Sequence, residues 1–277
     1  LLNQIEQVYQ KQHPIPLVWQ LVTSQLDCDR LDYSMRDSYF TGASYGRLDL
    51  DRILTALRYD PISQQLVVAE KGMAAIEHYL IVRYFMYAQV YNHPKNLAAT
   101  WVLERAFHRA RERLTMGQLE ADKTVRAWLQ QDCDQLPLQQ YLEADDGVFL
   151  YHLQRWQSQA DPILADLCRR YVNRDLLKAL DVTQLSADHQ QQLLQTIQQR
   201  LKSLGFLPDY YTGLRTTLSR GYTLYQRGIK LQTSTGLQEI SQRSPLVQTL
   251  IQPWQRSWLL YPREIDPTPL VQMDAIG

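Results

Sequence analysis

Apolar residues recur at helical spacing through most of the chain up to Leu204, and this period constrains the fold more than any other feature. Proline-containing breaks at residues 13–16, 92–94 and 161–162 divide the pattern into separate helices. We expect one early helix from about Leu17 to Ser38 and a long one from about Gly72 to Tyr91. The larger part of the chain is therefore predicted to be mainly α.

The pattern changes at Gly205, where β-prone residues replace the helical period. Tyr210-Tyr211 and residues 221–225 favour strands, and residues 229–232 and 237–240 flank a Thr-Ser-Thr-Gly turn typical of a hairpin. A short helix over 246–250 and a strand over 258–261 follow in the prediction. These changes predict three regions, namely 1–115, 116–204 and a small α+β lobe at 205–277.

Charge and cysteine content limit the classes of function. Twenty-nine basic residues balance twenty-nine acidic ones, which argues against a nucleic-acid-binding protein and requires a local basic cluster for any anionic ligand. Three cysteines without a CxxC pair fit a reducing cytosol. The sequence shows neither a bilayer-spanning apolar run nor a signal peptide, so we expect a cytoplasmic protein without membrane association.

One polar stripe lies on the early helix. Asp29, Tyr33 and Asp37 are spaced at i, i+4 and i+8 and share one face, with Arg30 beside it. Two carboxylates and a phenol in register make a wall suited to a polar ligand. The alternative is a solvated helix face held by Asp–Arg pairs.

A second stripe lies on the long helix, where Arg83, Tyr87 and Tyr91 have the same spacing. A guanidinium fork suits phosphate oxygens, and a flat phenol suits the face of a sugar or base. The alternative is an aromatic face packed in the core, with Arg83 extending to solvent. The two stripes together favour a polar ligand site.

The residues of the first stripe occur in a longer motif. The run from Ser24 to Tyr33, followed by residues 36–42, resembles the final metal-ligand helix of the HD-domain deoxynucleoside triphosphate (dNTP) triphosphohydrolases. Residues 83–93, 161–167, 173–178 and 205–211 resemble later segments of the same family, so the resemblance covers nearly the whole chain. It implies the end of an HD catalytic domain in 1–115, a helical extension in 116–204 and a C-terminal lobe in 205–277.

The resemblance also implies roles for single residues. Asp29 would be the catalytic metal ligand, and Tyr91 would lie against the sugar and select deoxynucleotides. Tyr87 takes the position of a His implicated in catalysis in the human SAM- and HD-domain member of the family. Residues facing the triphosphate would be Arg30, Tyr33 and Arg83, while Asp37 would accept the sugar 3′-hydroxyl.

The implied activity is metal-dependent hydrolysis of a dNTP to deoxynucleoside and tripolyphosphate, by a homo-dimer or tetramer. The divalent ion would be Mg, Mn, Fe, Ni or Zn. The family's other metal ligands, one His and a His-Asp pair, are expected upstream, because the sequence opens at Leu1 within a helical pattern. The alternative is a catalytically inactive relative that acts as a nucleotide-sensing or interaction subunit.

Overall fold

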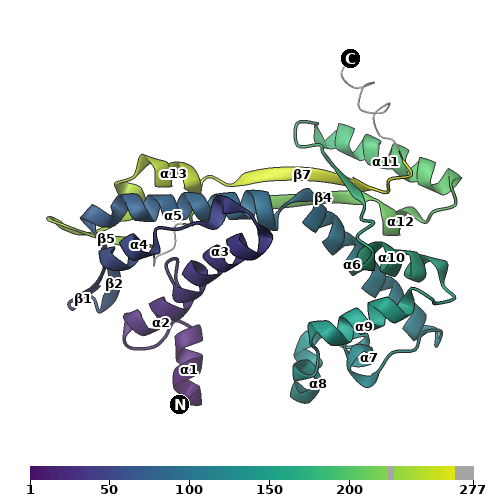
Figure 1. The fold of residues 1–277 in the computed structure, drawn as a ribbon, viewed down its shortest axis with the longest axis horizontal. Helices are drawn as coiled ribbons and strands as arrows, with labels where there is room; N and C mark the ends of the chain where they lie inside the picture. The colour runs from purple at the N-terminus through teal and green to yellow at the C-terminus, as the bar shows by residue number, and fades with distance from the viewer. Residues whose placement is uncertain (224–227, 266–277) are drawn as a thin grey trace. The chain divides into compact units, whose positions relative to one another are not determined.

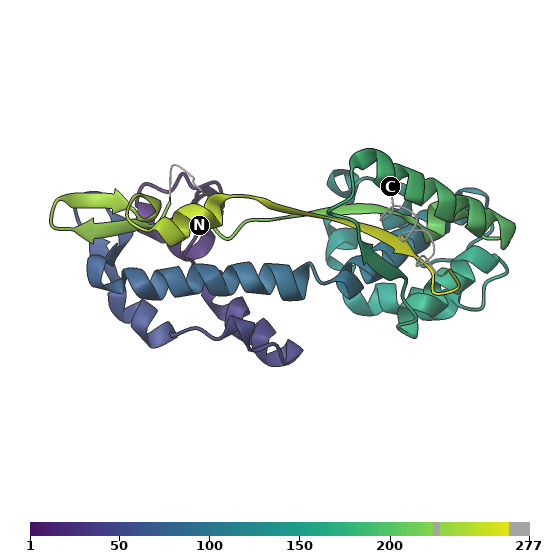
Figure 2. The same cartoon turned by 90° about the horizontal axis from the view of Figure 1, so that it is seen from above.

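The computed structural model describes residues 1–223 and 228–265, which are mainly helical as the sequence predicted (Figures 1 and 2). The chain forms two compact units, and neither is continuous in sequence. Unit 1 comprises Leu1–His93 and Leu218–Gln255, and unit 2 comprises Pro94–Thr217 and Arg256–Gly277. Each unit has its own cluster of buried apolar side chains.

Unit 1 contains both predicted polar stripes. The first stripe lies on helix α3 and the second on α5 and the helical turn that follows it. The elements of unit 1 are α1 (Leu2–Tyr9), α2 (Pro16–Thr23), α3 (Cys28–Thr41), η1 (Ser44–Gly46), α4 (Leu50–Ala56), β1 (Leu57–Asp60), β2 (Gln65–Ala69), η2 (Glu70–Gly72), α5 (Met73–Met86), η3 (Tyr87–Tyr91), β5 (Lys230–Thr233), β6 (Gly236–Glu239), η5 (Ile240–Gln242) and α13 (Pro245–Ile251).

A four-stranded sheet with the order β1-β2-β5-β6 joins the two segments of unit 1. Strands β2 and β5 are parallel, with Val68 opposite Leu231. The predicted hairpin is confirmed as the antiparallel pair β5–β6. Strand β1, which the sequence analysis missed, pairs antiparallel with β2. The core between the sheet and the helices includes Ile53, Val68, Ile76, Leu80 and Leu231.

The single helix expected from Leu17 to Ser38 is wrong, because α2 ends at Thr23 and α3 begins at Cys28. The Ser24 hydroxyl accepts a hydrogen bond from the Leu26 N–H at 3.0 Å. The Asp27 carboxylate accepts one from the Arg30 N–H at 2.8 Å and caps α3. Side-chain acceptors of this kind compete with the helical backbone bonds, so apolar spacing alone did not reveal the break.

Unit 2 is built around α6, which packs most extensively against α10. Helices α7, α9, α10, α11 and α12 contribute to the same apolar cluster, and β3 pairs antiparallel with β7. The elements are α6 (Pro94–Thr115), α7 (Lys123–Gln130), η4 (Cys133–Gln135), α8 (Leu138–Leu142), α9 (Asp146–Trp156), α10 (Pro162–Val172), β3 (Lys178–Asp181), α11 (Ala187–Ser203) and α12 (Pro208–Tyr211), with β4 (Gly213–Ser219) and β7 (Trp254–Tyr261) crossing the boundaries of the unit.

Two strand predictions in the tail are corrected. Tyr210 and Tyr211 lie in the short helix α12, which begins with Pro208 at its first position, and both rings are buried. Residues 221–223 are not in a strand, and residues 224–225 of that predicted segment lie outside the described residues. The strand itself falls earlier, at β4.

The three consecutive regions expected from the sequence, 1–115, 116–204 and 205–277, cut across the two units. Residues 94–115 belong to unit 2, and residues 218–255 return to unit 1. The expected boundaries followed changes of composition along the chain. Such changes do not reveal that β5 pairs with the distant strand β2.

The contact between α3 and η1 depends on a glycine. A Cβ atom at Gly46 would lie 2.1 Å from the Ser34 carbonyl oxygen and 2.5 Å from the Ser38 Cβ. We expect Gly46→Ala to lower the free energy of unfolding by about 1–3 kcal/mol, because the backbones of α3 and η1 must separate. Denaturant unfolding measures the loss. Gly147→Ala is the control, since its Cβ would meet only the Asp145 side chain, and equal losses would contradict the prediction.

Candidate functional site

Helix α3 positions the first stripe. Asp27 caps the helix at its start, and Gly42, in the left-handed region at φ 72°, ends it. Asp29 lies exposed in the first turn. Tyr33 and Asp37 are half-buried further along the helix, and both face residues of the second stripe.

The second stripe extends from α5 into a π-helical turn, η3. The Asn92 N–H donates to the Tyr87 carbonyl oxygen at 2.9 Å, which is the i→i+5 bond of this wider turn. The turn keeps Tyr87 and Tyr91 on one face, with ring centroids 5.2 Å apart. Single π-helical turns inside α-helices are frequently found at functional sites.

A hydrogen bond joins the two stripes. The Tyr91 hydroxyl donates to Asp37 Oδ2 at 2.6 Å, and the Tyr33 ring packs edge-on against Tyr91 at 6.3 Å. Burial and this bond raise the pKa of Tyr91 above its ordinary value, and burial likewise raises the pKa of Tyr33. The phenols are therefore neutral at physiological pH, so they can donate hydrogen bonds.

Arg83 is buried. Its side chain belongs to a residue only 6% exposed, and among the described residues no carboxylate lies within ion-pairing distance of it. Its Nη1 donates to Gln25 Oε1 at 3.1 Å, while its buried Nε has no partner among the described residues. The guanidinium lies 5.6 Å from the Tyr79 ring centroid. A buried, unpaired cation costs free energy until an anion reaches it.

Arg30 has a different environment. Its Nε donates to Asp27 Oδ2 at 3.2 Å, so its charge is already balanced by a carboxylate. Burial works against the charged form, but the interaction with Asp27 outweighs it and raises the pKa of Arg30. Burial raises the pKa of both Tyr33 and Tyr79, and the positive charges of Arg30 and Arg83 only partly oppose it.

The structure thus brings six predicted site residues into one cluster between α3 and the α5–η3 helix: Arg30, Tyr33, Asp37, Arg83, Tyr87 and Tyr91. Asp29 lies on the same helix but is exposed to solvent. The described residues include no group of three or more His, Cys, Asp or Glu side chains that could hold a metal ion. A single carboxylate does not hold a divalent ion tightly, so these residues do not fit a metal by themselves.

Three residues of the cluster were missed by the sequence analysis, namely Gln25, Asp27 and Tyr79. Gln25 and Asp27 were hidden in the segment assigned to a continuous helix. Ser24 and Asp27 are both residues preferred at helix starts, and this signal would have exposed the turn. Tyr79 stands one turn before Arg83 and carried no signal of its own, since a buried Tyr is ordinary in a helix core.

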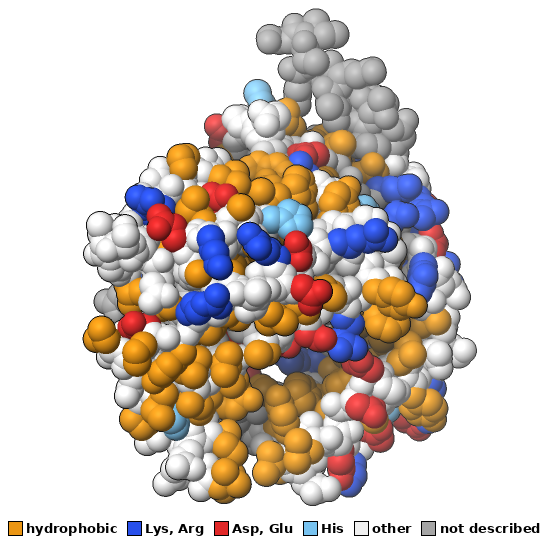
Figure 3. Space-filling view, turned by 60° about the vertical axis from the view of Figure 1, so that its left-hand side comes forward, with side chains coloured by type: hydrophobic (Ala, Val, Ile, Leu, Met, Phe, Trp, Pro, Cys, Tyr) orange, Lys and Arg blue, Asp and Glu red, His pale blue; other side chains and the backbone are white. Residues whose placement is uncertain are grey.

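The opposite side of α3 is apolar. With α4 it forms a groove of about 560 Å³, lined by residues that include Leu31, Met35, Phe40 and Leu54. Phe40 is 76% exposed. Exposed hydrophobic side chains also cover much of the face drawn in Figure 3. Helix α3 therefore separates a polar cluster from an apolar groove.

The chain belongs to the family described as the HD associated region, whose model matches residues 48–204, more than half of the sequence. The uncharacterized protein YwfO of Bacillus subtilis is 33% identical over 254 residues. That match covers 89% of this chain and 57% of YwfO, so the chain spans little more than half the length of this relative. The expected resemblance to HD-domain proteins is confirmed at the level of the family.

Two solved structures share the fold. A phosphohydrolase from Bacteroides thetaiotaomicron superposes with a TM-score of 0.81 at 26% identity, covering 93% of this chain and 66% of that one. A hypothetical protein from Aquifex aeolicus gives 0.65 at 22% identity, covering 95% and 62%, and shows the fold alone. In the described part of the chain, no helix combines the length and apolarity needed to cross a membrane.

Proposed function

We propose that this chain supplies the sugar- and phosphate-binding side of a metal-dependent nucleotide phosphohydrolase. Its substrate would be a dNTP, which reacts with water to give the deoxynucleoside and inorganic tripolyphosphate. The likeness to a phosphohydrolase, together with membership of the HD-associated family, supports the reaction class, and the same likeness supports the dependence on a divalent ion. The choice of a dNTP rests on the resemblance of the α3 motif.

The observation that carries the proposal is the buried Arg83 guanidinium, which lacks a carboxylate partner among the described residues. A triphosphate offers the anionic oxygens that such a group requires, and a guanidinium fork matches their geometry. Arg30 and Tyr33, which lie on α3, would face the same triphosphate, as the resemblance of the α3 motif implies. Within the site, these groups would bind the triphosphate and stabilise the charge that develops on the leaving group.

The sugar would lie against the hydrogen-bonded pair of Asp37 and Tyr91. Asp37 Oδ2 already accepts from the Tyr91 hydroxyl, and a carboxylate has further lone pairs for the 3′-hydroxyl. The ring of Tyr91 would fill the space of a ribose 2′-hydroxyl. Asp29 is the one residue of this chain that we assign to the metal, and the other ligands would come from the rest of the native protein.

The test uses the complete native protein in which this sequence occurs. Each dNTP is incubated with Mn²⁺ or Mg²⁺, and tripolyphosphate and deoxynucleoside are measured. We expect both products in equal amounts, and we expect Asp29→Ala to abolish them. Asp32→Ala is the matched control, because Asp32 lies on the same helix and forms only an exposed pair with Arg36.

The outcomes separate the two candidate functions. If dNTPs bind without turnover, the protein is the non-catalytic nucleotide-sensing subunit instead. If dNTPs neither bind nor react, the proposal is overturned. A homo-dimer or tetramer, expected for this family, remains part of the proposal, and the molar mass of the native protein in solution tests it.

A further inference from the structure

The turn between α2 and α3 holds both guanidiniums of the cluster. Both oxygens of Gln25 accept hydrogen bonds from α5. Its main-chain oxygen accepts from the Tyr79 hydroxyl at 2.8 Å, and its side-chain Oε1 accepts from Arg83 Nη1 at 3.1 Å. Burial raises the pKa of Tyr79 to about 12, so this phenol stays a donor. Gln25 is itself only 7% exposed. One residue therefore fixes two successive turns of α5.

Two residues later, Asp27 performs the same task for Arg30 with a different chemical group. Asp27 is 3% exposed, and its carboxylate accepts from both the backbone N–H and the Nε of Arg30. A carboxylate neutralises the cation that it holds, whereas an amide orients a cation and leaves its charge intact. The two arginines consequently differ in the charge that they can offer to a ligand.

We infer that Gln25 is a positioning residue that aims Arg83 at the phosphates of the bound nucleotide without neutralising it. The inference rests on the proposed function and deepens it, because it assigns the larger share of phosphate binding to Arg83. An acid at position 25 would form a charge-assisted pair with Arg83 and compete with the phosphate. The neutral amide is therefore the feature that keeps the site open to an anion.

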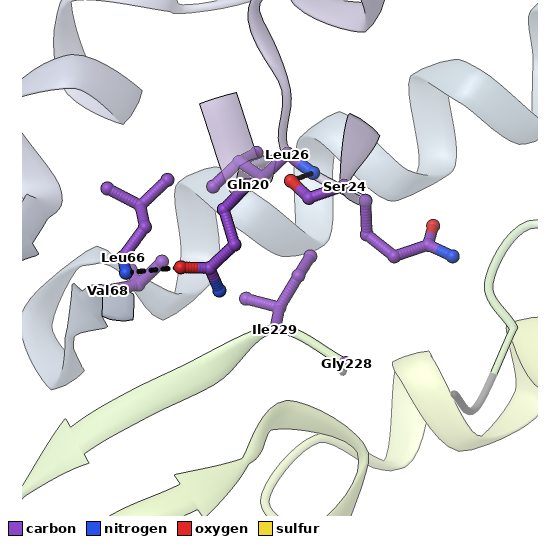
Figure 4. A pocket seen from close by; sticks show the side chains of 8 residues that line it. Gln20, Ser24, Leu26, Leu66, Val68, Gly228 and Ile229 are labelled. Carbon is purple, nitrogen blue, oxygen red and sulfur yellow. Dashed lines mark hydrogen bonds between the residues drawn. The ribbon is translucent and has the colours of Figure 1, made fainter. Parts of the chain in front are cut away.

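A small cavity next to this turn provides the matched control. It has a volume of about 20 Å³, enough for about one water molecule, and both Gln20 and Gln25 line it. Figure 4 shows Gln20 on this cavity with its bond to Leu66. Gln20 Oε1 accepts from the Leu66 N–H at 2.7 Å, and Gln20 is 6% exposed. The two glutamines thus share burial and cavity, but only Gln25 contacts Arg83.

The experiment compares Gln25→Glu with Gln20→Glu in the complete native protein. We expect Gln25→Glu to raise KM for dNTP, and to weaken binding of tripolyphosphate, by about tenfold or more. The value of kcat should change less. Gln20→Glu keeps an acceptor for Leu66 and should leave both quantities near their wild-type values.

Thermal unfolding separates positioning from a purely structural role. Gln25→Glu should unfold at the wild-type temperature or above it, because a buried cation gains a counter-ion while the main-chain bond to Tyr79 remains. Equal KM values for the two variants, or a KM loss that only follows a lower unfolding temperature, would overturn the inference. If Gln25→Glu does not fold, Gln25→Met is tested in its place. An unchanged KM for dNTP in Gln25→Met would also overturn the inference.

The readouts also keep this inference apart from the proposed function. Hydrolysis of dNTP with no difference between the two acid variants defeats the inference and leaves the function standing. Tripolyphosphate binding that is weakened by Gln25→Glu alone, in a protein without hydrolysis, defeats the function and leaves the inference standing. A native protein that neither hydrolyses dNTP nor binds tripolyphosphate overturns both.

Discussion

Arg83→Met is expected to abolish nucleotide turnover while leaving the protein as stable as before, or more stable. The lost guanidinium should lower kcat/KM by about 100-fold or more, because Arg83 is a buried cation without a carboxylate partner among the described residues. Removal of a buried charge without a counter-ion is neutral or stabilising when the replacement fills the same volume. Steady-state kinetics and thermal unfolding, measured on the same preparation, check both halves.

Arg36→Met is the control for this prediction. Arg36 lies on α3 in an exposed pair with Asp32, and exposed pairs contribute little to stability. Neither kinetics nor unfolding should change appreciably in this variant. Full activity of Arg83→Met would show that Arg83 does not bind the substrate. A large drop in the unfolding temperature of this variant would show that the guanidinium is mainly structural.

Asp37→Asn is expected to remove recognition of the sugar 3′-hydroxyl. The wild-type protein should prefer a dNTP to the matching 2′,3′-dideoxynucleotide by about 100-fold or more, since a site built to bind a hydroxyl rejects an analogue without it. The substitution should lower kcat/KM for the dNTP toward the dideoxynucleotide value. Parallel kinetics with the two substrates measure the discrimination ratio.

Tyr91→Phe completes the comparison. It keeps the ring and removes only the hydroxyl that donates to Asp37 Oδ2. If the ring excludes a ribose 2′-hydroxyl, this variant should retain its preference for deoxynucleotides over ribonucleotides. An undiminished discrimination ratio in Asp37→Asn would show that another residue reads the 3′-hydroxyl.

Helical spacing was enough to select the two polar stripes, but the contact between them was not predicted. Tyr33 and Asp37 on one helix, and Tyr91 on another, were selected by i, i+4 spacing, and the structure places their rings and carboxylate in contact. Helical spacing fixes which side chains share a face, but it does not say what that face contacts. Their roles toward a substrate stay predictions.

Helical spacing did not predict the residues that hold the two arginines by hydrogen bonds. Gln25 and Asp27 act through hydrogen bonds from a turn, and a turn interrupts the very period that the prediction used. Strand β1 and the pairing of β2 with β5 were missed for a related reason, because strand partners distant in sequence leave no local pattern. The apolar spacing along the sequence predicted most helices. Contacts between residues distant in sequence determine how the helices and strands pack, and the spacing does not reveal them.

The parallel pairing of β2 with β5 has a consequence for synthesis of the protein. Strand β2 emerges from the ribosome early, but its partner follows only after the whole segment Pro94–Thr217 has been made. At ordinary translation rates this delay is on the order of ten seconds. During that interval the apolar edge at Val67 and Val68 lacks its native neighbour, so newly made chains should depend on chaperones at this stage more than later.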